Sequence, residues 1–447
     1  MLSHEDNQKL CLTGPGTAMG RLFRRFWLPV LLSEELSEVD GAPIRVKVLH
    51  EDLVAFRDTE GKIGLIDPRC PHRGADFFFG RNEQGGIRCV YHGWKFDRHG
   101  DCLDIPSLPS DSSLKAKIRL KAYPTREAGG IVWAYMGPPE HEPAFPRFEF
   151  ATMSVKRRYA SKKLQECNWA QACEGSIDTA HFSFLHMGIS EDEDELQAAV
   201  SHSDLSGSEA MKRRIRWIKQ DGVPRYTVLP HEAGLVLGAA RSADEGHSYW
   251  RVAQILMPNH SLAPGAFPGE NHHGQAFVPI DDHSCWIYCY TWNPYRDLQP
   301  EEIDKFKTGH VVHASVDKHY VPLRNRRNDY LIDRDDQRSR SYTGIQGLSE
   351  QDACIQDSQG YIADRTQEHL IPTDAAIVQF RRTMLQAAAD LDKGMPPLAA
   401  AHPEAYFVRS GALLAEQDTP LETALIEQHG DPAWRVTARE TKVAERS

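Results

Sequence analysis

The sequence has 447 residues, of which 40% are hydrophobic and 26% charged, an ordinary balance for a globular protein of two or three domains. Its net charge of −11 argues against a general nucleic-acid binder, and no apolar run approaches the roughly 18 residues of a membrane helix. The polar N-terminus lacks the apolar segment of a secretory signal, so we expect a cytoplasmic protein that binds neither membranes nor nucleic acid. Nine cysteines are too few for a disulfide scaffold, whereas 21 histidines direct attention to metal sites.

The sequence pattern of the first third of the chain is typical of a β-rich domain. Residues 1–40 form an N-terminal segment in which Met19 to Leu32 look helical until Pro29 breaks the pattern. Short strand-like runs separated by Gly, Pro and Asp follow, at Ile44–Leu49, Leu53–Arg57, Gly64–Ile66 and Ile131–Ala134. The proline-rich stretch 137–143 is the best candidate for a domain boundary. We therefore predict a β-rich domain over 41–140 and a larger domain over 141–447.

The larger domain mixes helical and strand patterns. A helix is expected over Asn168–Leu185, and an amphipathic helix over residues 373–393 with Thr373 as its N-cap. Strand-like alternation runs through residues 210–295, at Arg214–Ile218, Tyr249–Leu256 and Cys285–Tyr290. The fold class predicted for the whole chain is α+β, with a small β domain in front of a larger domain built on a central antiparallel sheet flanked by helices.

Two cysteine–histidine pairs form the first candidate metal site. Cys70 and His72 are followed, after sixteen residues, by Cys89 and His92, in the pattern C-x-H then C-x2-H. Two thiolates and two imidazoles suit a soft or borderline metal, and zinc is the simplest alternative. Zinc fingers usually keep like ligands together, whereas here each loop supplies one of each. This arrangement suits two adjacent irons, one held by the cysteines and the other by the histidines.

A second candidate site lies in the helix expected after Asn168. Asp178, His181 and His186 follow the pattern D-x2-H-x4-H. Asp178 and His181 share a helix face, while His186 requires the helix to end or bulge nearby. Two histidines and one carboxylate form the facial triad of non-haem iron(II), although two such histidines can also be unrelated polar residues.

Both motifs resemble one family. The loops resemble the Rieske [2Fe–2S] motif, including Arg73-Gly74 after the first pair and Gly93-Trp94 after the second, and Asn168–His186 resembles the catalytic helix of Rieske non-haem iron ring-hydroxylating oxygenases. The resemblance implies a cluster on the four loop residues and an iron on His181, His186 and a late aspartate. Asp352 matches that aspartate best and Asp357 is next, whereas Asp333, Asp335 and Asp336 look like a solvated ion-pair face. Asp178 would then link the iron site to His92 of a neighbouring subunit.

The later segments Arg327–Arg334 and Asp364–Asp374 look like the phthalate 4,5-dioxygenase branch. This resemblance implies a terminal oxygenase, active as a homotrimer or stacked homohexamer, that uses O2 and electrons from NADH through a separate flavin and [2Fe–2S] reductase. Its expected reaction is dihydroxylation of a small aromatic acid to a cis-dihydrodiol. The alternative is a monooxygenase or an O- or N-dealkylase acting on an aromatic ether, amide or carboxylate. The chain has no dinucleotide-binding G-x-G-x-x-G motif after a strand, in agreement with an outside electron donor.

An aryl carboxylate requires a cationic contact in an otherwise apolar pocket, and arginine matches a carboxylate with two parallel hydrogen bonds. We name Arg214, Arg241 and Arg251 as candidates, with Arg213 and Arg216 beside them. Arg214 and Arg216 share one face if residues 213–218 form a strand, and a solvated outer sheet face is the simpler interpretation. Nearby aromatic residues belong either to a ring-shaped pocket or to ordinary core, namely Phe182, Phe184, Trp217 and Trp250.

Overall fold

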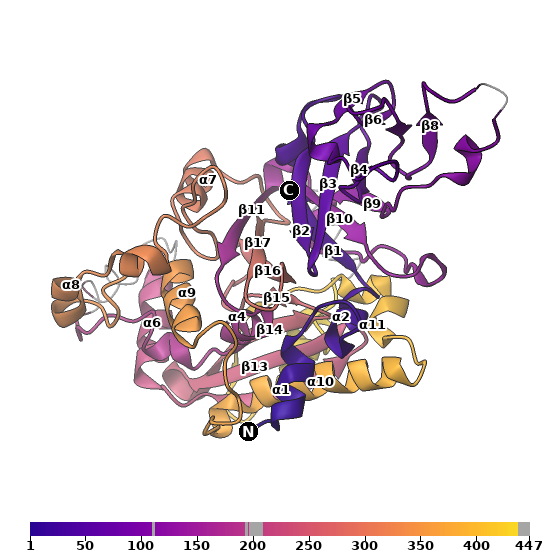
Figure 1. The fold of residues 1–447 in the computed structure, drawn as a ribbon. Coiled ribbons are helices and arrows are strands. Elements are labelled where there is room, and N and C mark those ends of the chain that lie inside the picture. The colour runs from indigo at the N-terminus through magenta and orange to yellow at the C-terminus, as the bar shows by residue number, and fades with distance from the viewer. Residues whose placement is uncertain (110–111, 193–194, 196–208, 437–447) are drawn as a thin grey trace.

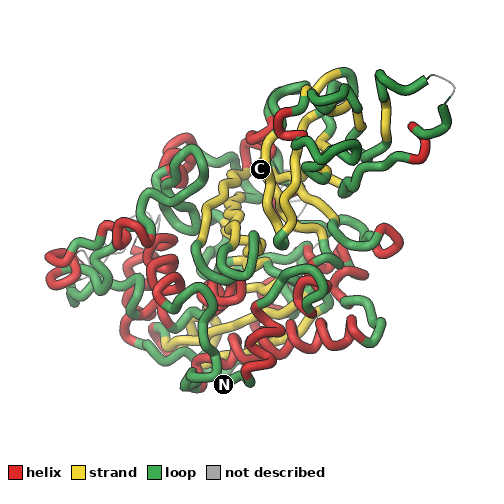
Figure 2. Tube along the Cα trace, viewed as in Figure 1, coloured by secondary structure: helices red, strands yellow, loops and turns green. Residues whose placement is uncertain are grey.

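The structure, a computed structural model, describes residues 1–436 apart from 110–111, 193–194 and 196–208 (Figure 1). A β-rich N-terminal part lies at one end of the molecule, and a larger part built on one long sheet forms the rest. Figure 2 shows helices gathered around the large sheet, whereas the N-terminal part consists mainly of strands and loops. The predicted α+β class is confirmed.

The N-terminal part contains three small sheets. Their orders are β1-β10-β9, β2-β3-β4 and β5-β6-β7-β8. The strands are β1 (Trp27–Leu32), β2 (Ile44–Val48), β3 (Glu51–Arg57), β4 (Ile63–Ile66), β5 (Arg81–Glu83), β6 (Gly86–Arg88), β7 (Lys95–Phe96), β8 (Cys102–Asp104), β9 (Thr125–Ala128) and β10 (Ile131–Tyr135). The four strands expected from the sequence in this part are present. The predicted boundary at 137–143 follows β10 directly and stays a prediction.

The expectation of a helix from Met19 up to the break at Pro29 is wrong beyond Phe23. Helix α2 covers only Ala18–Phe23, and the chain then forms β1, every residue of which is buried. Strand β1 pairs antiparallel with β10, Trp27 opposite Tyr135. A strand buried on both faces shows no period-two alternation, so its apolar run reads as helix from the sequence alone.

One antiparallel sheet organises the larger part. Its strand order is β11-β17-β16-β15-β14-β13-β12, and β18 pairs with β14. The strands are β11 (Arg158–Gln165), β12 (Arg225–His231), β13 (Gly234–Ser242), β14 (His247–Leu256), β15 (His260–Leu262), β16 (His272–Pro279), β17 (Cys285–Trp292) and β18 (Gly411–Glu416). In the β13–β14 pair, Arg241 lies opposite Tyr249 and Ala239 opposite Arg251. Both arginines therefore project from the same face of the sheet.

Helix α4 (Trp169–Ile177) begins at Asn168, whose side chain accepts a hydrogen bond from the Ala170 N–H, and contacts β15 and β16. It ends eight residues before the predicted end at Leu185. Asp178 is extended, and its carboxylate accepts hydrogen bonds from the N–H groups of Ala180 (2.7 Å) and His181 (3.4 Å). This local turn replaces the next turn of helix. A short 3-10 helix, His181–Ser183, follows.

The expected strand at Arg214–Ile218 is also wrong, because residues Glu209–Gln220 form helix α6. Its buried residues Met211, Ile215 and Ile218 recur at four and three residues, a helical period that the local arginine–hydrophobic alternation conceals. Helix α10 (Ala375–Asp392) confirms the amphipathic helix, but its N-cap is Asp374, after a 3-10 turn at Pro372–Asp374 that contains Thr373.

The remaining α-helices of the described residues are α1 (His4–Cys11), α3 (Glu149–Thr152), α7 (Pro300–Lys307), α8 (Arg334–Ser339), α9 (Leu348–Ser358), α11 (Leu398–Ala401) and α12 (Leu421–His429). Helix α9 contacts α4, which brings the late acidic segment beside the end of that helix. Over the described ranges, no helix combines the length and the apolarity needed to cross a membrane.

Candidate functional site

The two cysteine–histidine loops have matching backbone geometry. The Cys70 N–H donates to the Ala75 carbonyl and the Gly74 N–H donates back to the Cys70 carbonyl, each at 2.8 Å. In the hairpin between β6 and β7, Cys89 N–H donates to the Trp94 carbonyl (2.8 Å) and Gly93 N–H to the Cys89 carbonyl (2.9 Å). Gly74 and Gly93 have φ angles of +73° and +79°, a conformation that favours glycine.

These loops bring the four predicted side chains together. The rings of His72 and His92 are 4.4 Å apart between centroids, Cys70 and Cys89 are buried, and Trp94 stacks on His72 at 4.6 Å. His72 Nδ1 is buried without a hydrogen-bond partner among the described residues, as expected for a nitrogen that binds a metal. Burial raises the pKa of the Cys70 thiol to about 11, so a thiolate here needs a cation beside it. The donor set fits a [2Fe–2S] cluster.

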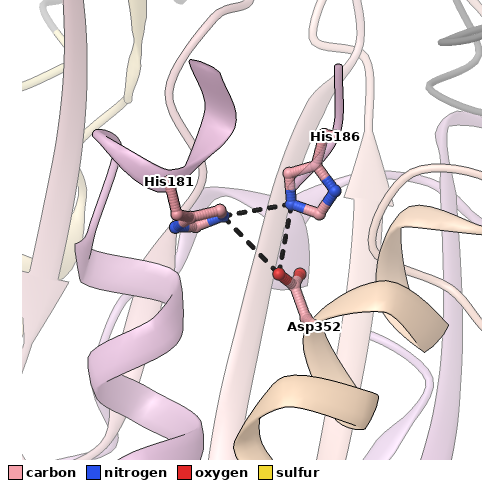
Figure 3. Close-up of side chains that lie close together, drawn as sticks. All are labelled: His181, His186 and Asp352. Carbon is pink, nitrogen blue, oxygen red and sulfur yellow. Dashed lines mark hydrogen bonds and ion pairs between the residues drawn. The ribbon is translucent and has the colours of Figure 1, made fainter. Parts of the chain in front are cut away.

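His181 and His186, five residues apart in the segment that follows α4, converge with Asp352 of α9 (Figure 3). Their candidate ligand atoms all lie within 4.8 Å of one another. The two histidine Nε2 atoms are 3.0 Å apart, and Asp352 Oδ1 is 3.5 Å from that of His181 and 3.1 Å from that of His186. Two imidazoles and one carboxylate around a common point suit iron(II) and leave coordination positions open.

The backbone reaches this geometry by a different route from the one expected. Asp178 and His181 do not share a helix face, because α4 ends at Ile177, yet Asp178 Oδ2 lies 3.5 Å from His181 Nδ1. The end of the helix also lets His186 turn back toward His181, as its spacing required. Asp352 enters from α9, near the middle of that helix.

Electrostatics favour a cation at this point. Burial opposes ionisation of His181, but the carboxylates of Asp178 and Asp352 outweigh it and raise the pKa of His181. Burial likewise opposes ionisation of Asp352, and the two histidines outweigh it, so the pKa of Asp352 is lowered. The same carboxylates would favour a metal cation bound between these side chains.

Gln351 is a part of the site that no sequence motif indicated. His186 Nδ1 donates to its side-chain oxygen at 2.7 Å, while the Gln351 amide nitrogen donates to the Ile345 carbonyl at 2.7 Å. The second bond fixes the orientation of the amide. His186 is thereby held with its proton on Nδ1 and with Nε2 free for a metal.

The other acidic candidates lie elsewhere. Asp357 accepts hydrogen bonds from Gln165 at 2.8 Å and from the Tyr330 hydroxyl. Asp333 caps helix α8, Asp335 pairs with Arg338, and Asp336 pairs with Arg340, an exposed ion-pair face as expected.

The three candidate arginines are buried and lie close together. Arg241 Nη2 donates to the Thr179 carbonyl (2.7 Å) and Arg251 Nε to the Thr179 hydroxyl (3.0 Å). Arg214, on helix α6 and not on a strand, donates to the Gly265 carbonyl at 2.9 Å, and a Cβ on Gly265 would lie 3.5 Å from Arg251 Nη1. Arg214 also forms a two-point ion pair with Glu270. Half-buried Arg216 pairs with Asp244 instead.

Of the aromatic candidates, Phe182 lies nearest the triad. Its ring centroid is 4.9 Å from that of His186, and the Arg251 guanidinium lies over it at 4.4 Å. Trp217 packs in the core with Tyr249, and Trp250 lies in a separate cluster, whereas Phe184 is exposed and contacts Tyr342.

Two family models match the chain. "Rieske [2Fe-2S] domain" matches residues 26–124, and "LigXa C-terminal domain like" matches residues 134–413. The chain is 36% identical to the 3-chlorobenzoate-3,4-dioxygenase oxygenase subunit of Comamonas testosteroni, over 94% of this chain and 97% of that one. It is 39% identical to the phthalate 4,5-dioxygenase oxygenase subunit of Pseudomonas putida, over 88% of each. The chain belongs to the Rieske non-haem iron oxygenases.

The fold of this oxygenase agrees with that of a solved relative. A structure of dicamba monooxygenase bound to dicamba superposes with a TM-score of 0.56, over 83% of this chain and 98% of that one, at 17% identity. The expected resemblance to the phthalate 4,5-dioxygenase branch is confirmed. The protein is an oxidoreductase whose cofactors are a Rieske cluster and a mononuclear iron, and it is the terminal oxygenase component of a multicomponent system.

Proposed function

We propose that this oxygenase dihydroxylates the ring of a small aromatic carboxylate to a cis-dihydrodiol. In this proposal Cys70, His72, Cys89 and His92 hold the cluster, and His181, His186 and Asp352 hold the iron. The cluster supplies single electrons, and the iron supplies the position at which dioxygen is reduced. The relatives named for phthalate and chlorobenzoate support the substrate class.

Unpaired buried arginines are the observation that carries this substrate class. Arg241 is fully buried and Arg251 is 8% exposed, yet neither forms an ion pair with a carboxylate in the part of the chain that the structure describes. Burial, followed by the charge of Arg251, lowers the pKa of Arg241 to about 10. Buried cations without a counter-ion are unfavourable, and an anionic ligand relieves that cost.

Arg251 is the best placed of the three to contact a substrate at the iron. Its charge is close enough to oppose protonation of His181, and its guanidinium lies over Phe182, which packs on His186. Arg214 donates to the Gly265 carbonyl and can reach a second acidic group if the substrate displaces Glu270, whose side chain is 41% exposed. We propose that Arg251 binds the ring carboxylate, with Arg214 and Arg241 completing a cationic wall.

Asp178 is proposed as the bridge between subunits. One of its oxygens faces His181 Nδ1, while the other accepts hydrogen bonds from backbone N–H groups, so the carboxylate is held beside the iron site. Among the described residues it forms no ion pair with Lys or Arg. In a head-to-tail homotrimer or stacked homohexamer, His92 of a neighbouring subunit donates to this carboxylate. The electron donor in this proposal is a separate NADH-fed flavin and [2Fe–2S] reductase.

Labelled dioxygen tests the reaction. Iron-loaded oxygenase, a surrogate reductase and NADH are offered phthalate isomers, chlorobenzoates and aryl ethers, and mass spectrometry counts the labelled atoms in each product. Two labelled atoms on a carboxylated ring are the expected result. One labelled atom, or loss of an alkyl or aryl group without a diol, would overturn dihydroxylation in favour of monooxygenation or dealkylation. Oxidation of NADH without product from any acid would overturn the substrate class.

A further inference from the structure

Thr179 lies between the proposed bridge Asp178 and the proposed ligand His181, and its three polar groups contact three adjacent strands. Its N–H donates to the Tyr226 hydroxyl on β12 at 3.2 Å. Its carbonyl accepts from Arg241 on β13 at 2.7 Å, and its hydroxyl accepts from Arg251 on β14 at 3.0 Å. The residue is 7% exposed. A single threonine thus joins the iron-site segment to the sheet by one bond to each strand.

The segment around Thr179 depends on these bonds because it belongs to no helix or strand. Helix α4 ends at Ile177, and the next 3-10 helix starts at His181. By contrast, β12, β13 and β14 are paired over their whole lengths, so the three side chains start from a rigid surface. Hydrogen bonds from side chains on a paired sheet therefore hold the backbone of this loop in one position more precisely than contacts within the loop would.

The chain maintains this arrangement at a cost in stability. Arg241 is fully buried, and its Nη1 finds no hydrogen-bond partner within the described part of the chain. Its other two nitrogens donate to backbone carbonyls, of Asp221 at 3.1 Å and of Thr179 at 2.7 Å. Charged donors make stronger hydrogen bonds than neutral ones. The use of a buried arginine to bind two loop carbonyls indicates that the position of the segment around Thr179 is important.

We propose that Thr179 is a positioning residue, through which Tyr226, Arg241 and Arg251 set the separation of Asp178 and His181. The inference rests on the proposed function, because it takes Asp178 as the electron-transfer bridge and His181 as an iron ligand. It also means that Arg251, which we place at the substrate carboxylate, bonds to the segment that carries both residues.

Substitution of Thr179 tests this role in the full-length holoenzyme. Thr179→Val keeps the shape and removes the acceptor for Arg251, and Thr179→Ser restores it. Tyr226→Phe removes the second contact. Thr383→Val is the matched control, since the Thr383 hydroxyl donates to the Gln379 carbonyl at 3.0 Å on α10. The readouts are bound iron, the melting temperature, and the single-turnover reoxidation of the reduced cluster, followed by its visible absorbance.

For Thr179→Val we expect full iron content and cluster reoxidation slowed by about tenfold, the scale of one lost hydrogen bond to a charged group. Thr179→Ser should recover most of the rate, and Thr383→Val should change only the melting temperature. The effects of Thr179→Val and Tyr226→Phe should be non-additive because both act on one segment. Reoxidation at the wild-type rate in Thr179→Val, or equal slowing in Thr383→Val, would overturn the positioning role. Retention of iron by His181→Ala would instead overturn the proposed function on which it rests.

Discussion

His181 and His186 each direct one ring nitrogen toward the proposed iron position and the other toward a side-chain oxygen. For His186 that oxygen belongs to Gln351. Replacement of Gln351 by Leu removes the acceptor, and the ring loses its fixed tautomer and orientation. We expect iron affinity to fall by about 10- to 100-fold, measured by competition with a chelator.

The control for this substitution is Gln386→Leu. Gln386 is on α10 and its amide donates to Asp390 in an exposed position. Its loss should leave iron affinity unchanged. An unaltered affinity in Gln351→Leu would show that His186 is oriented without this amide.

Arg251→Met tests the carboxylate contact. Methionine keeps much of the side-chain length but removes the charge, so the KM for the aromatic acid should rise by about 10- to 100-fold, as expected for loss of a hydrogen bond to a charged group. The KM for a neutral amide analogue should change little. Arg338→Met, on the exposed face of α8, is the control. An equal rise in KM for acid and amide would argue against a carboxylate contact.

Helix α4 carries the site segment, and a buried ion-pair network holds it in place. Glu174 accepts from Arg365 (3.0 Å) and from Arg381 (2.7 Å), and Arg381 also pairs with Glu368 at 2.6 Å. Arg365 further donates to Asn7 at 3.0 Å, which joins α1 to α4. The end of α4, and hence Asp178, therefore depends on contacts from both ends of the chain.

Glu174→Gln leaves buried Arg365 without a counter-ion and Arg381 with Glu368 alone, so we expect the free energy of unfolding to fall by about 3–5 kcal/mol, measured by urea titration. Burial raises the pKa of Glu174, but Arg365 and Arg381 outweigh it and the net pKa is lowered. A lowered carboxyl pKa stabilises the fold above the usual glutamate range, and this contribution is lost as the pH falls through the folded pKa. The difference between wild type and variant should therefore shrink in acid. A difference independent of pH would contradict the ionised state of Glu174.

At the scale of elements, the sequence predicted short strands better than helix ends. Runs such as Leu53–Arg57 sit between turn residues and form strands as expected. The end of α4 was missed because it depends on a turn formed by the Asp178 side chain. Helix α6 was missed because arginines alternate with hydrophobic residues there, which resembles a strand pattern. Asp352 was identified only by resemblance, because its approach to His181 depends on how α9 packs against α4. Gln351 and Thr179 have no motif, so only three-dimensional contacts reveal them.

Across the whole molecule, the strands beside the cysteine–histidine loops, β5 and β6, lie at the opposite end of the view from α9 (Figure 1). An electron path within one chain would have to span this separation, whereas a path between neighbouring subunits need not. Asp178→Asn should therefore leave both metal centres bound and abolish turnover. His92→Ala should also abolish turnover, but by disrupting the cluster. Co-expression of the two variants should restore part of the activity, because mixed oligomers contain an intact pair at some interfaces. Mixed oligomers no more active than either variant would contradict the intersubunit bridge.

One chain is proposed to hold both a Rieske cluster and a separate iron on His181, His186 and Asp352. Metal analysis of the purified oxygenase, combined with cluster absorbance, tests it most directly. We expect about three irons per wild-type chain, and about two in both His181→Ala and Asp352→Ala with cluster absorbance unchanged. Variants that keep the third iron, or a wild-type chain that binds only the cluster, would contradict it.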